Sequence, residues 1–257
     1  MAMIDSIFLL FVGIIVGMFG TLVGVGGGFI VVPLLTLAYG QSPQVAVGTS
    51  LCIVALNALS GTTVYIKQHR VDYRAGIYFS LATIPGSFLG AYLLQLVSAT
   101  AFDIGFGILI LMIAGYMVYS KRNEQDQSAP PQPVGSHRYS MVLGTVISFF
   151  VGFVASMAGI GGGVVHVPAM IYILKFQPYI AIPTSHFILA ISATFAAFSH
   201  GIIGKVAWDF VPFLGFGAIA GAQAGGHLSH TIKVKWILWG LILALVLVAI
   251  RLIGKHL

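Results

Sequence analysis

Long apolar runs limit the fold of this chain more than any other feature. Residues 105–120 and 236–250 are two such runs, and neither alternates polar and apolar residues as the strands of a membrane barrel do. Only 7% of the 257 residues are charged, against roughly a quarter in an ordinary soluble domain. Because backbone groups in lipid must bond to one another, helices or a closed barrel remain. We therefore expect an all-α polytopic membrane protein.

The sequence also repeats itself. When the second half is moved back by 135 positions, Gly17 falls on Gly152 and Pro33 on Pro168. The same shift aligns Gly26, Gly27 and Gly28 with Gly161, Gly162 and Gly163. Between the halves, residues 121–138 contain three prolines and almost nothing apolar, which is typical of a flexible linker. We predict a first membrane repeat at 1–120, a cytoplasmic linker at 121–138 and a second repeat at 139–257. Such duplication is common among secondary transporters.

Each repeat is predicted to contain four or five membrane helices, at 6–23, 28–39, 45–66, 76–96 and 103–120 in the first copy. The short blocks 28–39 and 163–174 each contain a proline and have the length of a re-entrant or broken helix. If they cross the membrane, the second repeat is inverted; if they dip in and return, the repeats run parallel. Nine Lys and Arg residues lie inside and three outside on either count, so the positive-inside rule does not decide. We favour inversion, which places both broken helices around one midplane site.

The two glycine runs are the first candidate binding site. Consecutive glycines permit an unwound backbone and the close approach of a ligand. The helix that resumes after them offers unpaired N–H groups at the positive end of its dipole, which suits an anion. The candidates are Gly26, Gly27, Gly28, Gly161, Gly162 and Gly163. The alternative is that these glycines only let helices pack closely.

Polar residues in the next span of each half are further candidates. Hydroxyl groups near the start of a span can donate hydrogen bonds to an oxyanion, and two of the histidines can offer a donor or a proton. The candidates are Thr49, Ser50, Asn57, Thr184, Ser185, His186 and, after the second glycine run, His166. Alternatively, the hydroxyls bond their own helix or cap it, and Asn57 and the histidines link helices. Other histidines, including His200, lie in loops or near segment ends and are expected at the membrane interface.

Several classes of function are excluded. No Asp, Glu, Lys or Arg lies in the middle of a predicted span, so a carboxylate proton relay has no candidates. The glycine runs lack the last glycine of a nucleotide fingerprint, and no hydrolase or zinc-protease motif occurs. A single cysteine excludes a multi-cysteine metal site. The net charge of +6 lies mainly in short loops and indicates no nucleic-acid partner. We expect neither cofactor nor metal, and no enzyme.

The motifs resemble those of the sulfite exporter TauE/SafE family. Both halves carry GxGGGxxxxP followed by PxxAxxTS, and the first also carries IPGxxxGAY at 84–92. The resemblance implies a transporter of sulfur-containing or related organic anions, such as sulfite and sulfonates.

Together, these observations predict a secondary transporter in the plasma membrane that exports small anions by alternating access at a midplane site between the two repeats. A passive anion channel is the alternative, and an intramembrane enzyme is less favoured. The expected partners are a small anionic substrate and the lipid bilayer, and a homodimer is left open.

Overall fold

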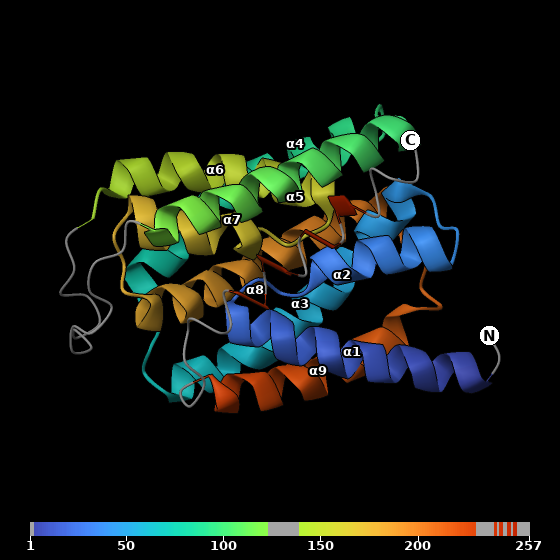
Figure 1. The fold of residues 1–257 in the computed structure, drawn as a ribbon, viewed down its shortest axis with the longest axis horizontal. Coiled ribbons are helices and arrows are strands. Elements are labelled where there is room, and N and C mark those ends of the chain that lie inside the picture. Colours follow the sequence, from blue (N-terminus) through green and yellow to red (C-terminus); the bar gives the residue numbers. More distant parts are fainter. Residues whose placement is uncertain are drawn as a thin grey trace.

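The computed structural model is a bundle of helices, and it describes residues 3–122, 139–229 and the pairs 239–240, 242–243, 246–247 and 249–250. These residues contain no strand, as expected for an all-α protein. Figure 1 shows the helices running mainly along the longest axis of the molecule. Five are long and apolar enough to cross a membrane: Ile4–Val23, Pro43–Lys67, Tyr73–Leu94, Met141–Ala158 and Pro178–Ile202.

The helices of the first half match the predicted segments to within four residues at each end. They are α1 (Met3–Val23), α2 (Gly28–Pro33), the π-helical turn η1 (Leu34–Ala38), α3 (Pro43–Lys67), α4 (Tyr73–Leu94) and α5 (Ala99–Arg122). Helix α5 thus extends two residues into the predicted linker. The rest of that linker, 123–138, and most of the last apolar block lie outside the described residues.

The second half repeats this order of elements. It contains α6 (Met141–Ala158), α7 (Gly163–Pro168), the π-helical turn η2 (Ala169–Ile173), α8 (Pro178–Ile202) and α9 (Val211–Leu228). The starts of α2 and α7, of η1 and η2, and of α3 and α8 are each 135 residues apart. The sequence offset therefore recurs in the positions of the helices.

Prolines account for several of these boundaries. Pro43 and Pro178 stand in the first turn of α3 and α8, where a missing N–H costs nothing. Pro33 and Pro168 end α2 and α7, and a π-helical turn follows each, because proline cannot donate the regular helical bond. Asp72 starts α4 by accepting a hydrogen bond from the N–H of Ala75 at 3.0 Å.

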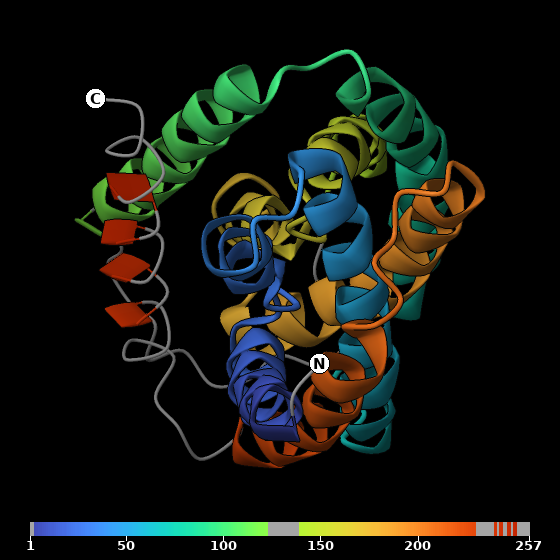
Figure 2. The same cartoon turned by 90° about the vertical axis from the view of Figure 1, so that its right-hand side faces the viewer.

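Helices of one half pack mainly on helices of the other. Helix α1 lies against α9, α4 lies against α6, and α3 packs against α8 between them. Glycines permit the close approach: a Cβ on Gly17 would lie 2.7 Å from Cα of Ala218, and one on Gly152 would lie 2.8 Å from Cα of Thr83. Small residues at helix contacts are typical of membrane bundles. Figure 2, seen along the helices, shows α5 at the edge of the bundle.

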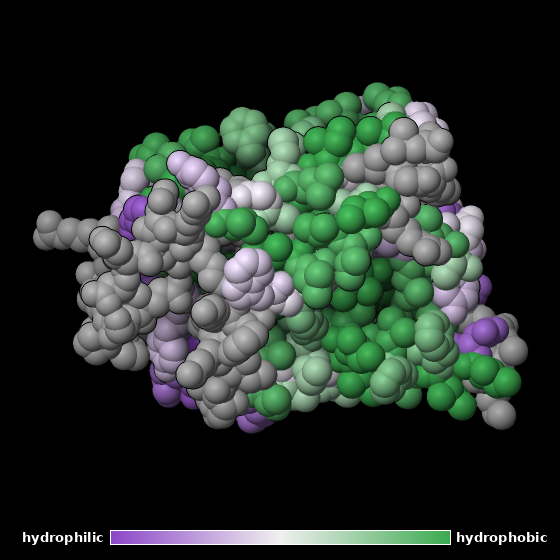
Figure 3. Space-filling view, in the orientation of Figure 1, coloured by the Kyte–Doolittle hydropathy of each residue, from purple (hydrophilic) through white to green (hydrophobic). Residues whose placement is uncertain are grey.

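The outer surface is apolar over the middle of the molecule. Ile4, Phe8, Phe11 and Ile15 recur along one face of α1, and between 43% and 78% of each side chain is exposed. Figure 3 shows hydrophobic residues across the centre of one side and hydrophilic residues toward both ends. Such a band is unsuited to water and fits the hydrocarbon core of a bilayer. The chain is therefore a multi-pass membrane protein.

Candidate functional site

The predicted glycine runs interrupt the chain between α1 and α2 and between α6 and α7. Three glycines in each run have φ values between +70° and +83°: Gly24, Gly26, Gly27, Gly159, Gly161 and Gly162. Residues with a side chain rarely adopt this conformation. All six are buried. Each run is thus unwound backbone in the interior of a membrane protein, which is tolerated only where protein or a cavity surrounds it.

The two runs touch each other at the centre of the bundle. A Cβ on Gly28 would lie 3.0 Å from Cα of Ile160, and one on Gly163 would lie 2.6 Å from Cα of Val25. Each would lie even closer to a carbonyl oxygen of the opposite run. A side chain at either position would force the backbones apart. No sequence pattern predicted this contact between the runs.

Ser50 and Ser185 bind the glycine run of the opposite half. The Ser50 hydroxyl donates a 2.8 Å hydrogen bond to the Gly159 carbonyl, and the Ser185 hydroxyl donates a 3.4 Å bond to the Gly24 carbonyl. Both serines are almost completely buried. In this conformation they hold the runs together, and breaking these bonds would free two hydroxyl donors beside the unwound backbone.

The neighbouring threonines hold loops instead. Thr49 donates to the Val45 carbonyl at 2.7 Å and accepts from the N–H of Ala207 at 2.8 Å. Thr184 accepts from the N–H of Asp72 at 3.0 Å. Ala207 precedes α9 and Asp72 precedes α4, so each threonine fixes the loop that follows a long helix of the other half. Only the bond of Thr49 to Val45 is of the kind that the alternative interpretation expects, because Thr184 bonds to a loop of the other half.

A buried polar cluster adjoins the first glycine run. Asn57 donates from Nδ2 to the Gly26 carbonyl at 2.9 Å, and Thr21 donates to Oδ1 of Asn57 at 2.7 Å. Nε2 of His186 lies 3.4 Å from the Thr21 hydroxyl, and the Tyr65 hydroxyl donates to the Thr21 carbonyl at 2.7 Å. We call Thr21, Asn57, Tyr65 and His186 the polar cluster; all four are fully buried. Thr21 and Tyr65 were not predicted, because they are isolated polar groups in apolar spans.

A small cavity adjoins the second run. Its volume is about 10 Å³, close to the minimum for one water molecule. The polar groups that line it come from Thr83, Ser87, Ser156, Ser192, Gly161 and Gly162. Within the described residues, the N–H groups of Gly161 and Gly162 have no backbone acceptor. The hydroxyls of Thr83, Ser87 and Ser192 donate to carbonyls of their own helices. They could donate to a small anion only after those bonds are exchanged.

The two runs therefore have different surroundings at equivalent positions. Thr21 and Asn57 lie 135 residues before Ser156 and Ser192, which line the cavity. The position equivalent to His186 is occupied by Leu51, which also borders the cavity. Beside the second run, where the cavity is found, a leucine thus takes the place of the imidazole and a serine takes the place of the carboxamide.

The other buried histidines are paired with serines. His166 places Nε2 3.0 Å from the Ser148 hydroxyl and stacks on Phe79, so its contacts lie between α7, α6 and α4. His200, expected at the interface, is only 2% exposed. Its Nε2 lies 3.3 Å from the Ser156 carbonyl. That expectation was wrong, because the last turn of α8 is covered by neighbouring helices although it lies near the helix end.

A buried cation lies between α3 and α4. The Arg70 guanidinium donates to the carbonyl of Tyr179 at 3.2 Å, and to the side chains of Gln68 and Ser229 at 2.9 Å each. It also stacks on the Tyr179 ring at 4.1 Å. The Tyr179 carbonyl is available because Pro183, four residues later, has no N–H to donate to it. Burial lowers the pKa of Arg70, and the two neighbouring tyrosines oppose that shift.

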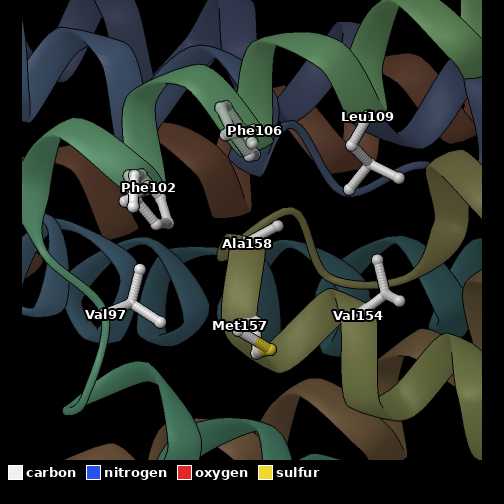
Figure 4. Close-up of a pocket in the computed structure, with 9 residues that line it drawn as sticks. Val97, Phe102, Phe106, Leu109, Val154, Met157 and Ala158 are labelled. Carbon is white, nitrogen blue, oxygen red and sulfur yellow. The ribbon is translucent and has the colours of Figure 1, made fainter.

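A larger groove of about 210 Å³ runs between α5 and α6. Figure 4 shows Phe102, Phe106 and Leu109 of α5 facing Val154 and Met157 of α6. Its lining is almost wholly apolar, so it offers no donors to an anion. We therefore place the candidate site at the glycine runs, although the groove has the greater volume.

Lipid-facing helices around two unwound segments define a multi-pass membrane protein of the transporter class. A sequence model of the family described as "Sulfite exporter TauE/SafE" matches residues 9–252. The chain belongs to this family.

Its relatives carry transporter names. The chain is 34% identical to "Probable membrane transporter protein YunE" of Bacillus subtilis, over 96% of this chain and 97% of the relative. It is 25% identical to a "Probable membrane transporter protein" of Xylella fastidiosa, over 93% and 91% of the two chains. A Haemophilus influenzae protein with the same name is 28% identical over 89% and 87%. No solved structure matches the chain.

Proposed function

We propose that the protein is a secondary transporter in the plasma membrane that exports small anions, with sulfite and sulfonates as the leading substrate class. The observation that carries the proposal is the small cavity beside the unwound backbone of Gly161 and Gly162. Its lining includes four residues with hydroxyl groups, and Gly161 and Gly162, whose N–H groups have no backbone acceptor within the described residues. Backbone N–H and hydroxyl groups held in fixed positions can replace the hydration shell of an oxyanion, so that no buried cation is needed to bind it.

The substrate class draws on the family as well as on the site. Sulfite and sulfonates present several oxygens that accept hydrogen bonds, which matches a site composed of donors. The cavity of about 10 Å³ is far smaller than such an anion, since it approaches the volume of one water molecule. Binding therefore requires the glycine runs to separate from their neighbours, as expected of a closed conformation in a transport cycle.

We further propose that residues 1–120 and 139–257 are inverted repeats joined by the linker. In Figure 1, α1 enters from the right-hand end of the bundle and α2 leads back toward it, whereas α6 and α7 do the same from the left-hand end. The contacts of Gly28 with the second run and of Gly163 with the first are equivalent under the 135-residue offset. Two copies that exchange conformations would open the shared centre to opposite sides in turn.

The remaining candidate residues take different parts in this proposal. Gly161 and Gly162 line the anion cavity, while Gly26, Gly27 and Gly28 form the opposing run. Ser50 and Ser185 join the runs in the closed state and donate to the anion when the runs separate. Thr49, Thr184 and His166 support the surrounding helices and loops.

Thermal unfolding in detergent tests the proposed substrate class. The purified protein is heated with sulfite, sulfate, sulfoacetate, taurine or chloride at matched ionic strength. An anion present at 100 times its dissociation constant adds about 2.7 kcal/mol to the free energy of unfolding, which is a resolvable shift. We expect a sulfur anion to stabilise the wild type and the Gly201→Leu control, whose new Cβ would have no atom within 4 Å. Gly162→Leu should abolish the shift, and the absence of any anion-specific shift in the wild type would contradict the proposal.

A further inference from the structure

His186 contains a buried nitrogen atom without a hydrogen-bond partner. The side chain is fully buried on α8, and its Nδ1 bonds to no atom of the described residues. Its other nitrogen, Nε2, lies 3.4 Å from the Thr21 hydroxyl. Buried polar atoms without partners are rare and require an explanation.

The hydrogen bonds of the polar cluster determine where the imidazole proton resides. Nδ2 of Asn57 donates to the Gly26 carbonyl, so Oδ1 of Asn57 is the acceptor for the Thr21 hydroxyl. Since Thr21 uses its only proton in that bond, its oxygen can only accept from Nε2 of His186. Nε2 therefore carries the proton of the neutral imidazole. Nδ1 is left as a bare lone pair.

The chain makes room for this imidazole at a specific place. A Cβ on Gly61 would lie 2.6 Å from Nε2 of His186, so a glycine is required opposite the ring. At the equivalent positions stand Leu51 in the first half and Ala196 in the second. The imidazole and the glycine opposite it thus have no counterparts under the 135-residue offset.

The other groups around His186 leave its Nδ1 free to take up a proton. From α3, the Tyr65 ring meets the imidazole edge-on at 5.7 Å, and its hydroxyl is used by the Thr21 carbonyl. Arg70 lies against Tyr65, 5.5 Å from that ring's centre. Asp72 is held to α8 through Thr184, and its carboxylate caps α4. From α1 comes Thr21, which is uncharged.

We propose that His186 takes up a proton on Nδ1 when the substrate anion binds, so that one proton and one anion cross together; this rests on the proposed function. An imidazolium in this apolar interior is costly without a negative partner. The polar cluster reaches Gly26 through Asn57, and Gly26 and Gly161 both lie against Val54 and Leu189. An anion between the runs therefore supplies the compensating charge. The proton comes from water on one side and returns to water on the other.

Reciprocity follows from this arrangement. If the anion favours protonation of His186, protonation must favour anion binding by the same factor. Transport should therefore accelerate on acidification of the side from which the anion enters, and an anion gradient should move protons.

The test uses proteoliposomes that contain a pH-sensitive dye, with labelled sulfate or sulfoacetate outside, since both remain fully ionised over the pH range used. Anion uptake and internal pH are measured together. We expect uptake by the wild type to acidify the lumen. His186→Gln should lose the proton movement and the pH dependence of uptake. His200→Gln is the matched control: it removes another buried histidine of α8, whose ring nitrogen already bonds to Ser156, and it should keep the wild-type ratio of protons to anions.

The outcomes separate this inference from the function on which it rests. Anion uptake by the wild type without acidification, or an unchanged proton-to-anion ratio in His186→Gln, would overturn proton coupling and leave anion transport standing. No uptake of either anion by the wild type would overturn both. If His186→Gln does not fold, Thr21→Val serves instead, because it removes the acceptor for Nε2–H and should shift the pH profile of uptake. An unshifted profile in that variant would also overturn the inference.

Discussion

Replacing Gly28 or Gly163 by alanine tests the contact between the glycine runs. The new Cβ of Gly28→Ala would lie 3.0 Å from Cα of Ile160, and that of Gly163→Ala 2.6 Å from Cα of Val25, both nearer still to a carbonyl oxygen. The atoms in the way belong to the backbone, so they cannot rotate aside. Overpacking of this kind costs about 1–3 kcal/mol, and we expect the upper part of that range.

The expected shift is large enough to measure. The smaller entropy of an unfolded chain with alanine returns about 0.4–1 kcal/mol, which leaves a net loss of about 2 kcal/mol. For a chain of this length, that corresponds to a melting temperature lower by about 4–8 °C. Gly201→Ala is the control, because its Cβ would meet nothing within 4 Å on α8. It should hold or raise the melting temperature, since alanine favours helix over glycine by about 1 kcal/mol.

The assay is thermal unfolding of the purified variants in one detergent, followed by light scattering and tryptophan fluorescence. Both run variants should lose stability, and Gly163→Ala at least as much as Gly28→Ala, because its Cβ would lie nearer to the opposite Cα. Melting of Gly28→Ala and Gly163→Ala at the temperature of the control would refute the reasoning, since the runs would then not lie against each other.

Three further predictions concern other parts of the molecule. Ser50→Ala should lower the free energy of unfolding by about 1–3 kcal/mol, because the buried Gly159 carbonyl loses its donor. Ser185→Ala should cost less, because its bond is 3.4 Å long against 2.8 Å for Ser50. A larger loss in Ser185→Ala than in Ser50→Ala in thermal melts would contradict this. Arg70→Lys should destabilise by about 1–3 kcal/mol, because lysine cannot reproduce the planar fork and leaves buried acceptors without donors. The exposed Lys67→Arg should change little. Similar melting of both variants would contradict the role given to the buried Arg70 guanidinium. In a Cys52→Ala background, a cysteine placed in the 121–138 linker should resist an impermeant maleimide added outside intact cells, and rapid labelling would show that the linker is not cytoplasmic.

The sequence predicted where the helices begin and end better than it predicted which helices pack against each other. Apolar run length and proline positions located α1 to α5 to within four residues, because both depend on local chain properties. The same signals say nothing about which helices touch. That α1 packs on α9 and α4 on α6 follows from glycines that meet a backbone far away in the sequence, such as Gly17 against Ala218.

For the site, the repeated motif identified equivalent residues but not their different roles. Thr49 and Ser50 are adjacent in the sequence, yet one hydroxyl bonds to a loop and the other to a glycine run, because successive helical positions point in different directions. His200 was expected at the interface from its place near a helix end, although tertiary packing buries it. The cavity beside Gly162 depends on short side chains from several helices, which no local pattern reveals.

Concentration-dependent uptake of labelled sulfite and sulfoacetate into proteoliposomes tests the central claim most directly. We predict uptake that saturates, that is lost in Gly27→Leu and Gly162→Leu, and that persists in Gly201→Leu. Flux that rises linearly with anion concentration would indicate a passive channel. Saturable uptake that is unchanged in both glycine-run variants would contradict the site.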